Sequence, residues 1–79
     1  MENSQHFEDM IHERGIAREW ADRAIAEPDR IEQQDDGTTH YLKRIVENDF
    51  RWLRVVVNET AHPARRITAF FDRRLRGQQ

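Results

Sequence analysis

The residues of this sequence best suited to chemistry are arginines and aromatic residues that alternate with aliphatic ones between Phe50 and Arg74. If Leu53, Val55 and Val57 point into a core, the side chains between them lie on the opposite face of a β-strand. Residues 66–72 repeat this alternation and add further side chains to the same outer face. The side chains expected on the shared outer face are Trp52, Arg54, Val56, Arg66, Thr68 and Phe70. Arginines beside aromatic rings are the combination with which proteins bind single-stranded RNA.

Arg54 is of particular interest because of its expected neighbours on the preceding strand. A four-residue loop at residues 47–50 places Lys43 opposite Arg54, and a five-residue loop places Arg44 there. Either register opposes two cations, which is mildly destabilising unless an anion lies between them. Two interpretations stay open. The face binds phosphate, or its long cationic side chains extend into water over an ordinary exposed sheet face, with Trp52 packed on Phe70.

The four histidines of the chain do not form a metal site by spacing. His6 lies near the start of a predicted helix, where it could act as a general base, although a histidine that caps or flanks a helix is commoner. His40 and His62 have no companion at a ligand spacing, and the chain has no cysteine. Metal-binding His-Glu-x-x-His, phosphate-binding glycine-rich and Gly-x-Ser-x-Gly motifs are absent as well. We therefore predict neither a metal nor a cofactor.

Two helices are expected to precede the strands. Asn3 or Ser4 can cap the first helix, and Gly15 supplies its C-terminal stop. The second helix begins after Ala17, which is a poor N-cap, and must end before Pro28.

Four strands are predicted at residues 30–34, 40–46, 51–57 and 66–72. Asp36-Gly37 predicts a two-residue type I′ turn between the first two strands. The sequence thus predicts one α+β domain over residues 3–73, with two N-terminal helices packed on one face of a four-stranded antiparallel sheet and a polar tail at 74–79. Its best-supported core residues are Leu53, Val55, Val57, Ile67 and Phe71.

Composition and charge exclude several classes of protein. The 79 residues are 37% hydrophobic and 35% charged, but patterned, which favours one small folded domain over disorder. Residues 1–50 are acidic and residues 51–79 basic. This split permits either a nucleic-acid partner or neutralisation of the strands by the helices. No apolar run approaches the length of a membrane helix and no signal peptide is recognisable, so we predict a cytoplasmic protein without a membrane partner.

Four short motifs resemble those of a group of small bacterial domains of unknown function. They are His6 with Arg14-Gly15-Ile16, Glu27-Pro28-Asp29, Tyr41 with Lys43, and the run Leu53-Arg54-Val55-Val56-Val57. The usual start of that group is His-Ala-x-x-Arg-x-x-x-Arg-Gly-Ile, and the resemblance covers residues 5–73. The group is similar in layout to the BrnT and RelE toxins, which pack N-terminal helices on a curved antiparallel sheet and cleave RNA without metal.

The resemblance implies a set of site residues and roles. His6 would be the catalytic base or acid, while Arg14, Lys43 and Arg54 would stabilise the phosphate. The residues expected to assist in RNA binding are Arg44, Trp52, Arg66, Thr68 and Phe70. This chain departs from the pattern at Phe7, where the group has alanine, at Met10, where it has arginine, and at Ala17, where a capping serine or threonine is usual.

Two hypotheses of different classes follow. The first is a small toxin-like, metal-independent domain that cleaves or binds RNA. The second is a non-catalytic interaction module that docks an antitoxin or another protein on its exposed sheet face or edge strand. Catalysis requires His6, Arg14, Lys43 and Arg54 to converge on one concave spot.

Overall fold

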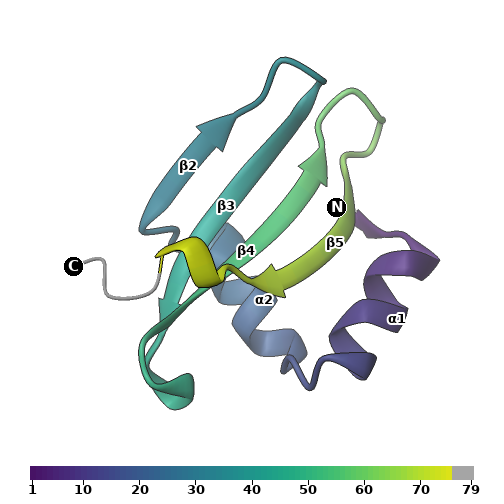
Figure 1. Cartoon of the computed structure of the whole chain (residues 1–79). Helices are drawn as coiled ribbons and strands as arrows, with labels where there is room; N and C mark the ends of the chain where they lie inside the picture. The colour runs from purple at the N-terminus through teal and green to yellow at the C-terminus, as the bar shows by residue number, and fades with distance from the viewer. Residues whose placement is uncertain (76–79) are drawn as a thin grey trace.

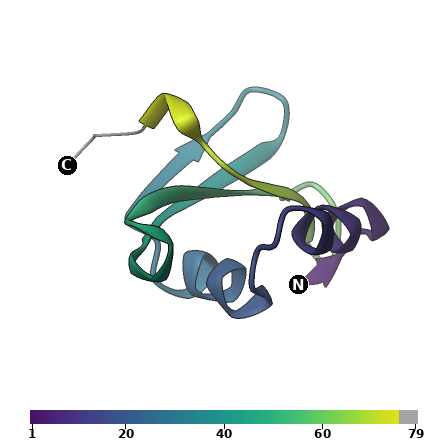
Figure 2. The same ribbon diagram turned by 60° about the horizontal axis from the view of Figure 1, so that its bottom comes forward.

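The computed structural model describes residues 1–75 and forms two layers, a twisted sheet and a pair of helices (Figure 1). The helices are α1 (Gln5–Glu13) and α2 (Arg18–Ala26). The strands are β1 (Glu2–Asn3), β2 (Arg30–Gln33), β3 (Thr38–Ile45), β4 (Arg51–Asn58) and β5 (Arg65–Phe71), and two 3₁₀ turns are η1 (Val46–Asn48) and η2 (Arg73–Leu75). Figure 2 shows both helices on one side of the sheet and η2 on the other side. The side of the sheet with η2 is called the open face.

The sheet has five strands in the order β1-β5-β4-β3-β2. The predicted α+β class and the two N-terminal helices are confirmed, but the four-stranded antiparallel sheet is wrong, because β1 adds a strand that runs parallel to β5. This strand is held by hydrogen bonds from the Glu2 amide to the Ala64 carbonyl and from the Ser4 amide to the Arg66 carbonyl. A two-residue strand is too short to show any alternation in sequence.

The helix ends follow from local chemistry. The Ser4 hydroxyl accepts a hydrogen bond from the Phe7 amide at 3.0 Å, so Ser4 is the N-cap of α1. Gly15 adopts a φ of 64° just after that helix, where a side chain would be strained. Ala17 precedes α2 without a side-chain cap, and the helix stops before Pro28. These predictions are confirmed.

The β2–β3 hairpin is present, but its turn differs from the predicted type. A type I′ turn needs a positive φ at both central residues. Gly37 has a φ of 87°, whereas Asp36 is not among the residues with positive φ. The Gln34 amide instead donates to the Thr38 carbonyl, and the Asp36 carboxylate accepts from the Thr38 amide and hydroxyl. The aspartate therefore fixes the turn through its side chain.

The core lies between the helices and β4. Leu53, Val55 and Val57 are fully buried, as predicted, and Phe7 of α1 and Ala69 of β5 join them. Phe71 is only partly buried but packs against this cluster. The alternating apolar residues of β4 thus form its buried face.

Because of a bulge in β5, the faces of the sheet predicted for two residues are wrong. Val56 pairs with Thr68, but Val57 pairs with Arg66, so Ile67 has no direct partner. Ile67 is half-buried and lies outside the core cluster. The extra residue turns Arg66 to the helix side of the sheet, opposite to the face predicted for it.

The register between β3 and β4 also differs from both predicted alternatives. Leu42 lies opposite Arg54, while Lys43 faces Leu53 and Arg44 faces Trp52. The strand ends at Ile45, so Val46 joins the loop and shifts the pairing. Since successive side chains alternate between faces, Lys43 points to the helix side and Arg54 to the open face.

Candidate functional site

Arg54 occupies the middle of the open face, where its side chain is only 7% exposed. Its Nε and Nη2 atoms contact the Asp72 carboxylate at 2.9 and 2.8 Å. Its Nη1 atom donates to Glu32 Oε1 at 2.9 Å and lies 2.8 Å from His40 Nδ1. Arg74 closes this ion cluster with a further bond to Asp72 at 2.9 Å. The guanidinium is surrounded by acceptors of the protein itself.

The cluster shifts the pKa of each acidic or basic group around Arg54. Hydrogen bonds from Arg74, and after them from Arg54, lower the pKa of Asp72 to about 2. A hydrogen bond from Arg54 likewise lowers the pKa of Glu32. Burial, and then the charge of Arg54, lower the pKa of His40. Because arginine can only donate, Nδ1 of His40 must be the unprotonated, accepting nitrogen.

This arrangement predicts a pH dependence of stability. Protonation of His40 is disfavoured most by burial, then by Arg54 and least by Arg74, while Glu32 and Asp36 favour it less strongly than Arg54 opposes it. The unfolded state therefore takes up a proton more readily, and the free energy of unfolding should fall as the pH drops below about 6.5, by at most about 1.4 kcal/mol per pH unit. Urea titrations between pH 7.5 and 5 should show this slope in wild type and in His12→Gln, a variant of an exposed histidine of α1. The slope should be reduced in His40→Gln, and an unchanged slope there would contradict the assignment.

The four residues proposed for catalysis do not come together around Arg54. Lys43 lies on the helix side, where its Nζ atom is 3.5 Å from the Asp29 carboxylate. His6 is exposed in the first turn of α1, and Arg14 is the C-cap of that helix. Arg54 faces the other side of the sheet, so the structure separates it from Lys43 by the thickness of the sheet.

The predicted RNA-binding residues are also divided between the faces. Arg66 is buried on the helix side, with its Nη1 atom 2.7 Å from Asp22 and its guanidinium 4.6 Å from the centroid of the Phe7 ring. Thr68 and Phe70 are half-buried on the open face.

Trp52 lies on the open face but is largely covered by arginines. The guanidinium groups of Arg30 and Arg44 lie over its ring, 5.2 and 6.0 Å from the centroid. In this conformation the Trp52 ring is buried and offers little surface for stacking.

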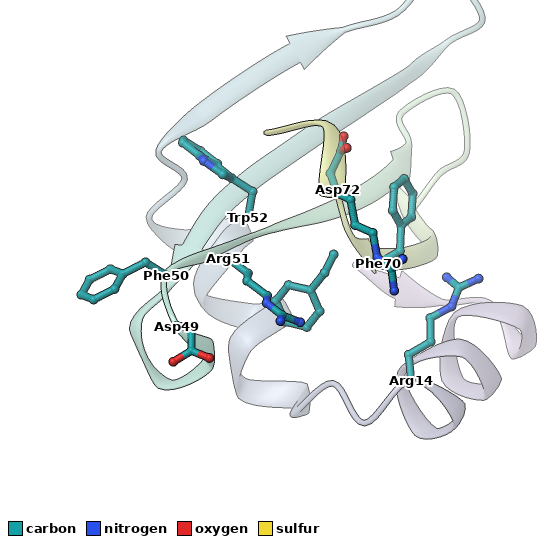
Figure 3. A pocket seen from close by; sticks show the side chains of 9 residues that line it. Arg14, Asp49, Phe50, Arg51, Trp52, Phe70 and Asp72 are labelled. Atoms are coloured by element: carbon teal, nitrogen blue, oxygen red, sulfur yellow. The ribbon is translucent and has the colours of Figure 1, made fainter. Parts of the chain in front are cut away.

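A cavity of about 460 Å³ lies at the end of the sheet where β4 starts and β5 stops. Arginines from three elements line it, namely Arg14 at the end of α1, Arg51 at the start of β4 and Arg73 in η2. In Figure 3, Arg14 extends toward Phe70 at the end of β5, and Arg51 extends into the same space from the opposite side. Its lining also includes the aromatic residues Phe50, Trp52, Phe70 and Phe71.

These arginines differ from the others in lacking an acidic partner. Within residues 1–75, Arg14, Arg51 and Arg73 form no ion pair, whereas every other arginine except Arg44 pairs with a carboxylate. Arg14 is held by a bond from Nη1 to the Ala69 carbonyl at 2.8 Å. Asp49 and Asp72 also line the cavity, but Asp72 is already paired in the ion cluster. The cavity therefore has an excess of positive charge.

Of these lining residues, sequence reasoning selected Arg14, Trp52 and Phe70 but missed Arg51, Arg73 and Phe50. A usable signal was present. In an antiparallel hairpin the start of the first strand and the end of the second lie at the same end, so Arg51 and Arg73 had to be near each other.

The model of the family described as Domain of unknown function (DUF4258) matches residues 3–71. The chain belongs to this family. The match takes in α1, α2, Arg14 and Arg51 and ends with β5, so η2 with Arg73 follows the DUF4258 match. No curated protein and no solved structure matched the chain.

Two further findings concern membrane-spanning helices and metal ions. Neither α1 nor α2 is long and apolar enough to span a membrane. Within residues 1–75, no three His, Asp or Glu side chains are grouped so that they could hold a metal ion.

Proposed function

We propose that this DUF4258 domain binds RNA, with Arg14, Arg51 and Arg73 contacting the phosphate backbone at the cavity. The observation that carries the proposal is their convergence from three elements without a carboxylate partner in residues 1–75. Guanidinium groups bind phosphate through paired hydrogen bonds. Aromatic rings in the same cavity suit the bases that accompany those phosphates.

Internal neutralisation accounts for most of the remaining positive charge. Arg18 and Arg65 pair with carboxylates at exposed positions and Arg23 at a half-buried one. Arg54 and Arg66 pair at buried positions. Neutralisation within the fold and binding of a nucleic acid, the two interpretations of the charge split, thus apply to different arginines. Paired arginines stabilise the fold, and the unpaired set at the cavity remains for a ligand.

We propose that the domain binds RNA but does not cleave it. The nitrogens of Arg54 are occupied by Glu32, His40 and Asp72, and Lys43 lies across the sheet from it. A cluster able to stabilise a pentavalent phosphate would need free donors aimed at one point. A descendant of BrnT- or RelE-like toxins that kept RNA binding in the bacterial cytoplasm would fit this arrangement.

The proposal predicts that RNA affinity depends on the unpaired arginines. Arg51→Gln/Arg73→Gln should bind a labelled RNA oligonucleotide about 30-fold more weakly than wild type, at about 1 kcal/mol for each lost phosphate contact. Fluorescence anisotropy over a range of salt concentrations should also show the slope of log affinity against log salt falling by about 2.

The control variant Arg18→Gln/Arg65→Gln changes the net charge equally, at exposed arginines that are paired with Glu8 and Glu2. It should retain most of the affinity. Equal losses in both double variants would point to general charge attraction, and absence of RNA binding by wild type would refute the proposal.

A second candidate function, docking of a protein such as an antitoxin, is favoured by β2. This strand ends the sheet, and within residues 1–75 no strand pairs with its outer side. Ile31 in its middle is 54% exposed. A partner strand added along β2 would form a complex that resists salt, in contrast to the RNA complex.

A further inference from the structure

The turn between β3 and β4 holds two consecutive non-glycine residues in the left-handed region. Asp49 has a φ of 57° and Phe50 a φ of 59°. Aspartate tolerates this conformation, but a bulky aromatic residue rarely adopts it, because its Cβ crowds the backbone. Strain of this kind persists only where the surrounding structure imposes it, and it concentrates at functional sites.

The strained backbone places the Phe50 ring outside the core. The residue is 55% exposed, and its amide donates to the Ile45 carbonyl at 3.0 Å, which closes the turn. Phe50 is one of the residues that line the cavity, and Figure 3 shows its ring at the outer edge of this site, pointing away from the side chain of Arg51. The guanidinium of Arg44, an arginine without an ion pair in residues 1–75, lies 5.4 Å from the ring centroid. Burial cannot explain phenylalanine here, since the ring remains largely in water.

We infer that Phe50 stacks on an unpaired base, so that the RNA bound at the cavity is single-stranded. The inference rests on the proposed function and names its substrate class. Arg51, the next residue, holds the phosphate, while Phe50 provides the aromatic surface that the covered ring of Trp52 does not. Bases inside a duplex are stacked on each other and cannot reach such a ring.

The neighbouring charges favour a nucleic acid over an apolar protein partner for this ring. Val46 in the same turn is also exposed, at 56%, but Arg44 lies over the Phe50 ring and Arg51 follows Phe50 along the chain. Aromatic rings interleaved with arginines bind single strands without sequence preference, because every base has a π-face.

Substitution of Phe50 by residues that tolerate a positive φ tests the inference without breaking the turn. Phe50→Gly and Phe50→Asn should fold as wild type does by circular dichroism and thermal melting, because both relieve the backbone strain. Each should bind a single-stranded RNA about tenfold more weakly than wild type. Both should bind an abasic ribose-phosphate strand of equal length as tightly as wild type does, and wild type should prefer the single strand to a duplex of the same sequence.

The control is Val46→Ala, which removes an equally exposed apolar side chain from the same turn and should leave all affinities unchanged. Equal binding of the base-bearing strand by wild type and both Phe50 variants would overturn stacking. So would an equal loss of affinity for the abasic strand in the Phe50 variants, or a similar loss of affinity in Val46→Ala. A preference of wild type for the duplex over the single strand would also overturn it. If wild type binds neither the base-bearing nor the abasic strand, the proposed function itself fails.

Discussion

Arg54→Ala should lower the free energy of unfolding by about 3–5 kcal/mol, because it removes the buried cation that two carboxylates of the ion cluster share. The side chain of Asp72 is only 2% exposed and would keep only Arg74, while Glu32 would keep the more distant Arg30 at 3.5 Å. A loss of this size is comparable to the whole stability of many small domains. Urea denaturation followed by tryptophan fluorescence measures it.

Two further variants separate the ion cluster from ordinary surface pairing. Arg65→Ala removes an exposed pair with Glu2 and should change stability by less than about 1 kcal/mol. Arg54→Leu/Glu32→Gln/Asp72→Asn removes the charge of Arg54 together with those of both carboxylates and should recover part of the loss seen in Arg54→Ala. A stable, fully folded Arg54→Ala protein would contradict the stabilising role given to this arginine.

Phe7→Ala should have a comparable effect, with a loss of about 3–5 kcal/mol in the free energy of unfolding. The Phe7 side chain is fully buried at the centre of the contact between α1 and the sheet. Its ring also lies under the guanidinium of Arg66, 4.6 Å from the centroid, so its removal leaves a buried cation without the aromatic surface beside it.

A double-mutant cycle resolves the two contributions of Phe7. Phe7→Leu keeps much of the volume, so combining it with Arg66→Met isolates the interaction between ring and guanidinium, which should be about 1 kcal/mol. Met10→Ala, at a half-buried position of the same helix, should cost clearly less than Phe7→Ala. Similar losses at both positions would contradict the central place of Phe7 in the core.

Prediction of the candidate site from sequence was limited by pairings between distant residues. Arg54 contacts Glu32 and Asp72, which lie 22 and 18 positions away along the chain. An alternating pattern indicates that Arg54 lies on the outer face, but it carries no information on whether carboxylates meet it there. Arg14 was selected from the family motif, yet its neighbours at the cavity are Arg51 and Phe70 rather than Lys43 and Arg54.

The sequence by itself determined the two helices, the four longer strands and the buried face of β4. The Ser4 cap, the Gly15 stop and the break before Pro28 are local interactions within a few residues, and the alternation of Leu53 and Val55 repeats with the period of a strand. Such signals do not depend on what packs against the segment, so they can be recognised in the sequence alone.

Only the tertiary structure decided how those elements meet. One added loop residue, Val46, places Leu42 rather than a cation opposite Arg54, and one extra residue in β5, Ile67, turns Arg66 from one face to the other. Because side chains alternate with a period of two, a shift of one residue exchanges the faces of a strand. Local pattern therefore could not show which arginines at the cavity stay unpaired, since only the final register decides which arginines find a carboxylate.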